Sequence, residues 1–592
     1  MDLLLPWVAA LVAILIVPGW SFYFDVTPKV VMVLAGAALA LVFLKPAARN
    51  RWFVRILALQ AIALIVATFF STHRWFSLYG STWRRTGFFA QAAILIFAMA
   101  SAQPARRSWL RILVMVSIPV SLYAILQYLG IDPILPSGPY HVGEGKYMIV
   151  RPPATLGHAS YLATYLLFAI FAAAELMRLE STRAWRSAAA AASALAFFAM
   201  ILSGTRAALV GFAVGALFLA VRQRVNRRVL IAGAAAVVIL AAFYISPLGE
   251  RLRARVFWSS EDPLGGSRLT LWRDTIRMSL ERPLTGYGPE TFSMEYPRHQ
   301  SIELARAFPD FYHESPHNIF LDALVSNGLL GLIGIIALAA FGLAIARGFL
   351  GAGFIAMLVA QQFTAFTLPT ELYFYLALAM LVGQMQPANR VSSVGRPKKP
   401  QAGTDAVSPP GTAAPHVAAY AAVALVFMVF AVYLATGDAL LAWARRALDQ
   451  GDPDRAANLL DRARHWNAAA DFYFSRRFAN APAHDPVEHL RFWQYGFAAA
   501  SHAPETADDP QNALLNLAAF QAGLNDAPGV EQNLRRAIAI APEWYKPHWL
   551  LAQVLEQQGR SAEALSEAQA AAARDGAKHP EVAATLQHIR SR

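Results

Sequence analysis

Arginine residues recur in four short segments that separate long apolar stretches of the chain. They are Arg84 and Arg85 in TWRRT, Arg151 in IVRPPATLGH, Arg206 in LSGTR and Arg268 in GGSRLTLWRD. A guanidinium group matches phosphate oxygens two at a time, so these segments, if they converge, would bind a diphosphate without a metal ion. Two alternatives stay open, above all for Arg84 and Arg85: a side chain that extends to a membrane surface, or an ion pair with a local Asp or Glu.

Two histidines lie close together in YHESPHNIF, at positions 313 and 317. A neutral imidazole can accept a proton from a hydroxyl near neutral pH, which makes His317 the candidate general base and His313 the second candidate. Histidines four residues apart can also ligate a metal on a helix, but Pro316 argues against a continuous helix, and the chain has no cysteine. We therefore predict no metal and no cofactor. The simpler alternative for His317 is a capping role at the start of a helix.

Hydropathy predicts the elements that position these residues. Only 15% of the 592 residues are charged and the mean hydropathy is +0.39, whereas soluble proteins carry about 25% charged residues. Apolar runs of about 20 residues can cross about 30 Å of hydrocarbon, which predicts an all-α, polytopic membrane protein. The thirteen predicted spans are residues 3–19, 28–44, 55–71, 86–102, 109–129, 159–178, 184–203, 207–223, 228–246, 318–346, 349–367, 371–386 and 416–436.

The distribution of basic residues predicts the topology. Lysines and arginines gather in every second loop, which is typical of loops that face the cytoplasm. The remaining loops then face outward, and they include the long segment 247–316 and all the candidate arginines and histidines. An odd number of spans also places residues 437–592 outside. The same bias explains the net charge of +13 better than nucleic-acid binding does.

Composition divides the chain into four parts. Residues 1–386 form a core of about twelve spans, and residues 387–415, rich in Pro, Ser, Gly and basic residues, form a cytoplasmic linker. Residues 416–436 are the thirteenth span, and residues 437–592 form a tail. Away from their ends, the spans hold almost no charged residues except Asp322, so ion-coupled transport is poorly supported.

The tail repeats with a period of 34 residues, with copies that start at positions 437, 511 and 545 and a degenerate copy in 471–510. This spacing is typical of the helix pairs of tetratricopeptide repeats, whose concave surface binds protein partners. An alanine-rich helical tail without true repeats is the alternative. Small residues recur at the same two places in the copies: Ala444, Ala518 and Ala552 in the first helix, and Ala463, Ala537 and Ala571 in the second.

The run His317-Asn318, nine residues, Gly328, two residues and Gly331 resembles the signature of bacterial O-antigen ligases. Their relatives, the O-antigen polymerases and the bacterial protein O-oligosaccharyltransferases, share it. The stretches TLGHASYLATYL, LSGTRAALVGF and RLTLWRDTIRMSLERPLTGYGPETF resemble the same superfamily. The resemblance covers roughly residues 70–385 and does not separate the three activities.

This resemblance implies a GT-C-like glycosyltransferase of the bacterial inner membrane. Such an enzyme transfers a glycan from undecaprenyl diphosphate to an acceptor on the periplasmic side, without a metal and with inversion. The resemblance implies that His317 is the general base and that Arg206, Arg268 and Arg151 bind the diphosphate. Many members have Asn-Pro-Asn after the Leu-Gly of the TLGHAS motif, where this chain has His158, Ala159 and Ser160, so the role of His158 stays open.

The acceptor is not determined by the sequence. We expect an O-antigen ligase-like transferase of lipopolysaccharide biosynthesis, and lipid A core, a glycan or a protein are the possible acceptors. A polymerase that extends a second lipid-linked glycan is the nearest alternative, followed by a protein O-oligosaccharyltransferase. A non-catalytic assembly scaffold is an alternative of another class, and it would need neither His317 nor the outward arginines. Membrane lipids and a protein partner of the tail complete the expected partners, and nucleic acid is not among them.

Overall fold

The computed structural model describes residues 3–43, 50–103, 107–135, 141–144, 147–222, 238–254, 266–310, 312–385, 415–466 and 469–591. In these residues the chain is helical apart from one short antiparallel hairpin of β1 (His141–Glu144) and β2 (Tyr147–Val150). The predicted all-helical class is thus confirmed, with this hairpin as a small addition.

Six described helices are long and apolar enough to cross a membrane, so the chain is a multi-pass membrane protein. They are α3 (Arg51–Phe69), α6 (Arg107–Tyr128), α7 (Ala159–Leu179), α8 (Arg183–Leu202), α15 (Ile319–Ile345) and the apolar part of α18 (Pro415–Asp449). Six further predicted spans coincide with shorter helices: α1 (Leu4–Ile14), α2 (Thr27–Phe43), α5 (Phe88–Ser101), α9 (Arg206–Arg222), α16 (Gly348–Ala360) and α17 (Leu368–Gln384). The predicted span 228–246 lies mostly outside the described residues, so the count of thirteen stays a prediction.

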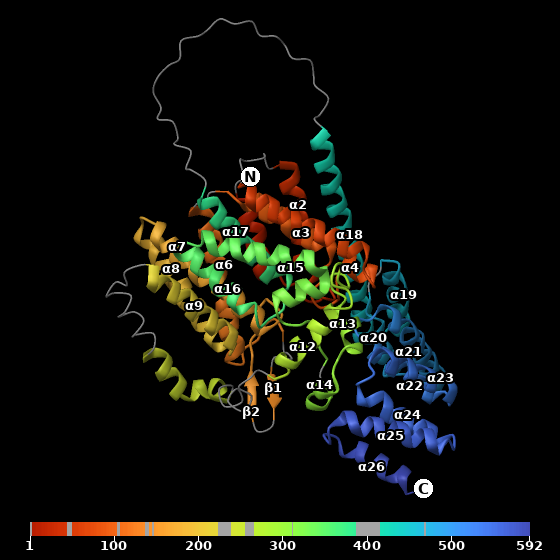
Figure 1. Ribbon diagram of the computed structural model, residues 1–592. Coiled ribbons are helices and arrows are strands. Elements are labelled where there is room, and N and C mark those ends of the chain that lie inside the picture. The colour runs from red at the N-terminus through yellow and green to blue at the C-terminus, as the bar shows by residue number, and fades with distance from the viewer. Residues whose placement is uncertain are drawn as a thin grey trace, which may run out of the picture.

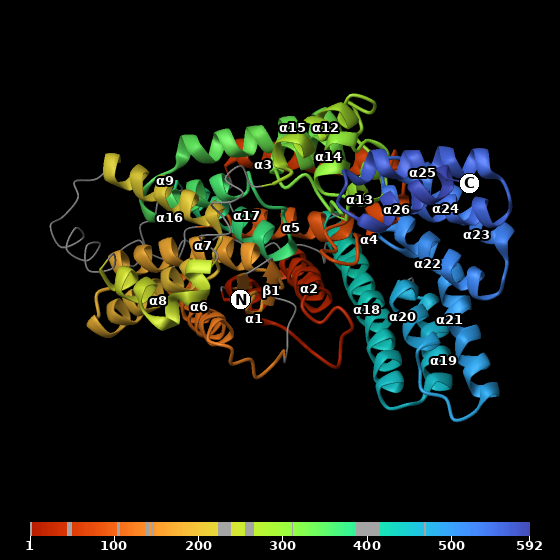
Figure 2. The same cartoon turned by 90° about the horizontal axis from the view of Figure 1, so that it is seen from below.

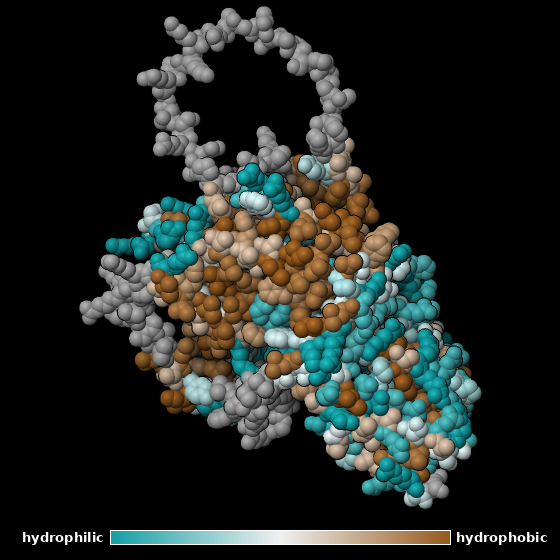
Figure 3. Space-filling view, viewed as in Figure 1, coloured by the Kyte–Doolittle hydropathy of each residue, from teal (hydrophilic) through white to brown (hydrophobic). Residues whose placement is uncertain are grey.

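The core helices pack around α7 and α17. Helix α7 contacts α6, α8 and α16, and every residue of α17 from Leu368 to Gly383 is buried. Figures 1 and 2 show these helices as one body, with α15 and α3 side by side on its surface. Hydrophobic residues cover the visible face of this body, whereas the tail is mainly hydrophilic (Figure 3). The core thus presents the apolar surface that contact with lipid requires.

Helix α18 joins the membrane core to the tail. It packs against α2, and its 35 residues measure about 52 Å at 1.5 Å per residue, more than the thickness of a bilayer core. The helix continues through residue 437 without a break, so its last part serves as the first helix of the tail. The predicted linker 387–415 lies outside the described residues except for Pro415.

The tail is built from successive helices that pack as neighbours, α18 with α19, α20 with α21, α22 with α23 and α24 with α25. The six alanines of the 34-residue period are all buried, at 0–3% exposure, because helices that cross closely leave room only for small side chains. The assignment to tetratricopeptide repeats stays a prediction. The tail helices are α19 (Pro453–Arg464), α20 (Asp471–Ala479), α21 (Pro486–Thr506), α22 (Pro510–Gly523), α23 (Ala527–Ile540), α24 (Tyr545–Gln557), α25 (Ser561–Asp575) and α26 (Pro580–Arg590).

The segment that precedes α15 in the chain packs against a kink in this helix. Gly328 has a φ of +63°, and a Cβ there would lie 2.3 Å from the carbonyl oxygen of Leu284. Next to the kink, the amide of Tyr287 donates to the carbonyl of Val325 (2.9 Å), and the amide of Leu329 donates to that of Pro283 (2.7 Å). The first glycine of the His-Asn-x9-Gly signature therefore has an architectural role, because only glycine combines this φ with this close approach.

Candidate functional site

Six of the eight candidate residues line one cavity of about 1090 Å³, although they come from five separate segments of the chain. The two others, Arg85 and His313, are not part of its wall. The convergence that was only a condition in the sequence is therefore present in the structure. The six residues are Arg84, Arg151, His158, Arg206, Arg268 and His317.

Two helices begin in the wall of this cavity, and each begins with an arginine. Helix α9 starts at Arg206, and α12 (Arg268–Ser279) starts at Arg268; the residues before both, Thr205 and Ser267, also line the cavity. The first turn of a helix carries backbone N–H groups without partners in the helix and the positive end of its dipole. Each helix start thus combines a guanidinium group with an anion-binding backbone.

His317 is held at the cavity by the residue that follows it. The side chain of Asn318 caps α15 by accepting hydrogen bonds from the amides of Phe320 (3.0 Å) and Leu321 (3.2 Å). The amide of His317 donates to Ser315 Oγ (3.2 Å), and its φ is +51°. The capping alternative for His317 is therefore wrong, since Asn318 is the cap and the His317 ring lies in the cavity wall.

The surroundings of His317 keep it neutral. Burial and the nearby Arg268 lower its pKa to about 3, with smaller contributions from the two other histidines and Arg84. A neutral ring retains one nitrogen that can accept a proton. The low pKa also makes it a weak base in the empty cavity, and a bound anion next to Arg268 would raise this pKa by offsetting the positive charge.

Helix α12 fixes the distance between its arginine and the histidine loop. Trp272 lies one turn after Arg268, and its indole N–H donates to the carbonyl of Pro316 (2.9 Å), next to His317. Arg268 itself donates to the carbonyl of Phe363 (3.4 Å). The break predicted from Pro316 is present, and its carbonyl serves as the attachment point for α12.

The opposite wall is the start of α7. Nδ1 of His158 accepts a hydrogen bond from the amide of Ser160 (3.2 Å), so His158 caps α7, and Arg151 donates to Ser160 Oγ (3.4 Å). A large part of the His158 ring faces the open cavity, yet the walls around it and Arg151 lower its pKa to about 3. At Gly157, where φ is +82°, a Cβ would lie 2.3 Å from Asp25 Oδ2. The positive φ favours glycine at this position of the TLGHAS motif.

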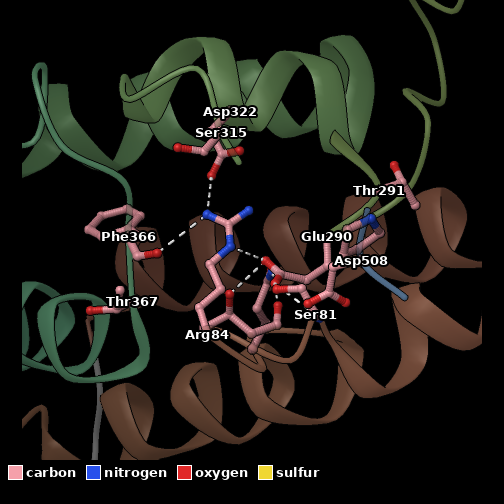
Figure 4. A network of polar contacts seen from close by, with 12 residues as sticks. Ser81, Arg84, Glu290, Thr291, Ser315, Asp322, Phe366, Thr367 and Asp508 are labelled. Carbon is pink, nitrogen blue, oxygen red and sulfur yellow. Dashed lines mark hydrogen bonds and ion pairs between the residues drawn. The ribbon is translucent and has the colours of Figure 1, made fainter. Parts of the chain in front are cut away.

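Arg84 differs from the other arginines because two acids hold it (Figure 4). Its Nε lies 2.5 Å from Glu290 Oε1 and its Nη1 lies 3.4 Å from Asp322 Oδ2, and Arg84 is only 3% exposed. Burial opposes its charge, but Glu290 and Asp322 outweigh burial and raise the pKa of Arg84. Glu290 also accepts from Ser81 Oγ (2.5 Å). The ion-pair alternative is thus confirmed for Arg84.

Arg85 and His313 have other positions. Arg85 lies over the ring of Tyr23 (5.0 Å) and 3.9 Å from Asp438 of α18, at the junction of core and tail. His313 is 4% exposed and stands edge-on to Tyr296 (5.7 Å), and burial lowers its pKa to about 4. Both were candidate site residues, and the structure places both in packing roles.

Some residues of the wall were not predicted. Lys29, at 1% exposure, donates to the carbonyl of Thr155, and as a lysine at the outward start of a predicted span it carries the same signal as the arginines. Glu314 lies three residues before His317, and burial raises its pKa despite Arg84. In the part of the chain that the structure describes, no group of three or more His, Asp or Glu side chains is arranged to hold a metal ion.

Two comparisons with known proteins match part of this chain. Residues 191–336 match the sequence model of a family described as O-antigen ligase, a range that includes Arg206, Arg268 and His317. Over this part of its length, the chain is similar to the O-antigen ligase family. It is also 27% identical over 212 residues to the exopolysaccharide production protein ExoQ of Rhizobium meliloti (strain 1021). That alignment covers 33% of this chain and 46% of the relative, less than half of its length. Both similarities cover only part of this chain.

Proposed function

We propose that the protein transfers a glycan from undecaprenyl diphosphate to an acceptor hydroxyl, as an O-antigen ligase-like glycosyltransferase. One observation carries this proposal: two helix starts with Arg206 and Arg268 share a cavity with His317. The topology proposed from the basic loops places this cavity and the tail on the periplasmic side of the bacterial inner membrane. A lipid-linked donor can enter there from the bilayer.

The arginines bind the diphosphate and stabilise it as a leaving group. Negative charge grows on the diphosphate as the bond to the sugar C1 breaks, and fixed positive groups stabilise that charge more than the ground state. Arg206 and Arg268 provide forks that match phosphate oxygens, and the starts of α9 and α12 add backbone donors. Arg151 supplies a third cation from the opposite wall. Val210 and Leu269 line the same cavity and offer an apolar path to the lipid.

His317 deprotonates the acceptor hydroxyl while that oxygen attacks C1. The oxygen forms a bond to C1, the bond from C1 to the diphosphate breaks, and the proton moves to the free nitrogen of His317. The diphosphate raises the pKa of His317 when it binds, since it offsets Arg268, so the base is strengthened only with a donor present. A single displacement of this kind inverts the configuration at C1, and it uses no metal.

A second candidate differs only in the acceptor. The relative ExoQ is named for exopolysaccharide production, which favours a polymerase that adds the glycan to another lipid-linked glycan. The cavity of about 1090 Å³ is large enough for two sugar-bearing substrates by the usual size of ligand sites, about 300–1,000 Å³.

Reconstitution distinguishes these candidates. Purified full-length protein is mixed with an undecaprenyl diphosphate-linked glycan and, in separate reactions, lipid A core, a candidate acceptor protein, or no second acceptor. Mass spectrometry identifies the product. A glycan on lipid A core supports the ligase, and a longer lipid-linked glycan without added acceptor supports the polymerase. If no arm yields a product, the proposal of a glycosyltransferase is wrong.

A further inference from the structure

One stretch of the chain lies between the cavity and the tail, and we call residues 306–310 and 312 the strap. Phe308 and Tyr312 line the cavity. From the same stretch, Arg306 Nε donates to the carbonyl of Ala573 in α25 (2.5 Å). Helix α14 (Ile302–Ala307), in which the strap begins, packs against α25. The strap therefore has one side in the cavity wall and another side on the tail.

Side chains strengthen the attachment along the strap. Asp310 accepts a hydrogen bond from the hydroxyl of Tyr545 (3.2 Å) and forms an ion pair with His579 Nε2 (3.0 Å). The hydroxyl of Tyr312 donates to the carbonyl of Asp508 (2.9 Å), in the turn between α21 and α22. The tail thus contacts the strap at three points, and the last of these belongs to a residue of the cavity wall.

The same turn of the tail also holds the loop that bears Arg84. Asp508 Oδ2 accepts hydrogen bonds from the amide of Thr82 (2.8 Å) and from its hydroxyl. Thr82 precedes Arg84 by two residues, and Tyr312 precedes His317 by five. One turn of the tail therefore connects two parts of the cavity wall that are far apart in sequence.

We propose that Phe308 and Tyr312 bind the acceptor as a carbohydrate, and that the tail positions them through the strap. This inference rests on the proposed function. In the proposed function the helix starts of α9 and α12 bind the diphosphate. The acceptor must then reach His317 along another part of the cavity wall. Phe308 and Tyr312 are in this wall and precede His317 closely in the chain. Flat aromatic rings pack on the apolar face of a sugar ring. Tyr312 and Phe308 are specificity residues, and Asp310 and His579 are positioning residues.

The test compares acceptor and donor constants in the full-length protein. Tyr312→Phe keeps the ring and removes the hydroxyl that donates to the tail. Asp310→Asn and His579→Gln break the ion pair from its two sides. The matched control is Arg446→Gln. It removes a contact outside the strap, the hydrogen bond from Arg446 of α18 to the carbonyl of Gly19 (2.9 Å). The measurements are KM and kcat for the acceptor and the Kd for undecaprenyl diphosphate.

We expect the KM for the acceptor to rise about 2–10-fold in Tyr312→Phe, the usual value of one hydrogen bond. Asp310→Asn and His579→Gln should each raise the KM for the acceptor about 2–5-fold, the range of partly exposed ion pairs. The double variant should raise this KM by about the same factor, because both substitutions break the same ion pair. The kcat, the donor Kd and the control variant should be unchanged. A purely structural strap would instead lower kcat and donor affinity together.

Three results would overturn the inference. Transfer with an unchanged acceptor KM in all strap variants removes this inference alone and leaves the proposed function intact. Absence of transfer by the wild-type protein removes the proposed function and this inference with it. A loss of acceptor affinity only with a protein acceptor, and not with a glycan acceptor, would show that the strap does not recognise carbohydrate.

Discussion

Two groups of arginines at the same end of the membrane core differ in what surrounds them. Arg84 lies between Glu290 and Asp322, whereas Arg206 and Arg268 are the first residues of helices that begin in the cavity wall. From the sequence, all of them are predicted to be outward-facing arginines between apolar spans. Residue type alone therefore does not distinguish Arg84, which two acids hold, from Arg206 and Arg268, for which we propose diphosphate binding.

Substitution of Arg84 should have the largest effect on stability. Arg84→Gln leaves Glu290 and Asp322 buried without their cation, and breaking a buried ion pair from one side costs about 3–5 kcal/mol. The measurement is the free energy of unfolding in detergent. Arg206→Gln, at a position that is only partly buried, is the comparison variant, and we expect it to lower the free energy of unfolding less. Equal destabilisation by the two variants would remove the distinction between the groups.

Substitution of Arg206 should act on transfer instead. Arg206→Ala removes a charged donor to the diphosphate, so we expect the barrier to rise by about 1–3 kcal/mol. Arg206→Lys keeps the charge but loses the fork, so it should lie between the wild type and the alanine variant. The measurement is kcat/KM for the donor. Near-normal transfer by both Arg206→Ala and Arg268→Ala would show that the diphosphate binds elsewhere.

The two histidines sharpen the same comparison. His313 packs edge-on against Tyr296 outside the cavity wall, and such a pair contributes about 0.5–1.5 kcal/mol to stability. His313→Ala should therefore lower the free energy of unfolding by about that amount and leave transfer within a few-fold of the wild type at a temperature where the variant is folded. A loss of transfer without a loss of stability would move the base from His317 to His313.

The pH dependence should report the low pKa of His317. Burial and Arg268 lower this pKa to about 3 in the free enzyme, so the neutral ring persists above that pH and is lost only as the pH falls towards it. The acidic limb of kcat/KM should thus lie well below the usual histidine pKa of about 6.5. A limb at or above pH 6.5, with the enzyme shown to be folded, would contradict this environment.

The sequence selected residues that line one cavity, although it left their convergence as a condition, and it was less accurate for the ends of the membrane helices. Hydropathy located the helices, but it missed some of their ends. Helix α1 stops at Ile14 and α16 at Ala360, although the predicted spans continue to residues 19 and 367. Period and residue size identified the buried alanines of the tail. Neither pattern showed that α18 continues from span to tail, because hydropathy ended the span at residue 436 and the repeat began at residue 437.

Part of the site could not be predicted because it depends on contacts distant in sequence. The presence of a lysine at the predicted outward start of a span could have indicated Lys29. The pairing of Arg84 with Glu290 could not be predicted, because it joins residues 206 positions apart. The roles of Asn318 as cap and of Trp272 as the link to Pro316 also follow only from the fold. Residue types selected the candidates, and burial together with hydrogen-bond partners assigned their roles.

The most direct test measures transfer and donor binding in the same His317→Ala protein. General-base catalysis usually contributes about 10²–10⁴-fold, so the account predicts a loss of that size in kcat. The Kd for undecaprenyl diphosphate should be unchanged or slightly lower, because Arg206 and Arg268 remain and the neutral ring contributes no charge. Full transfer with an intact donor complex would contradict the account, and His158 and Glu314, which line the same cavity, would then be the residues to substitute.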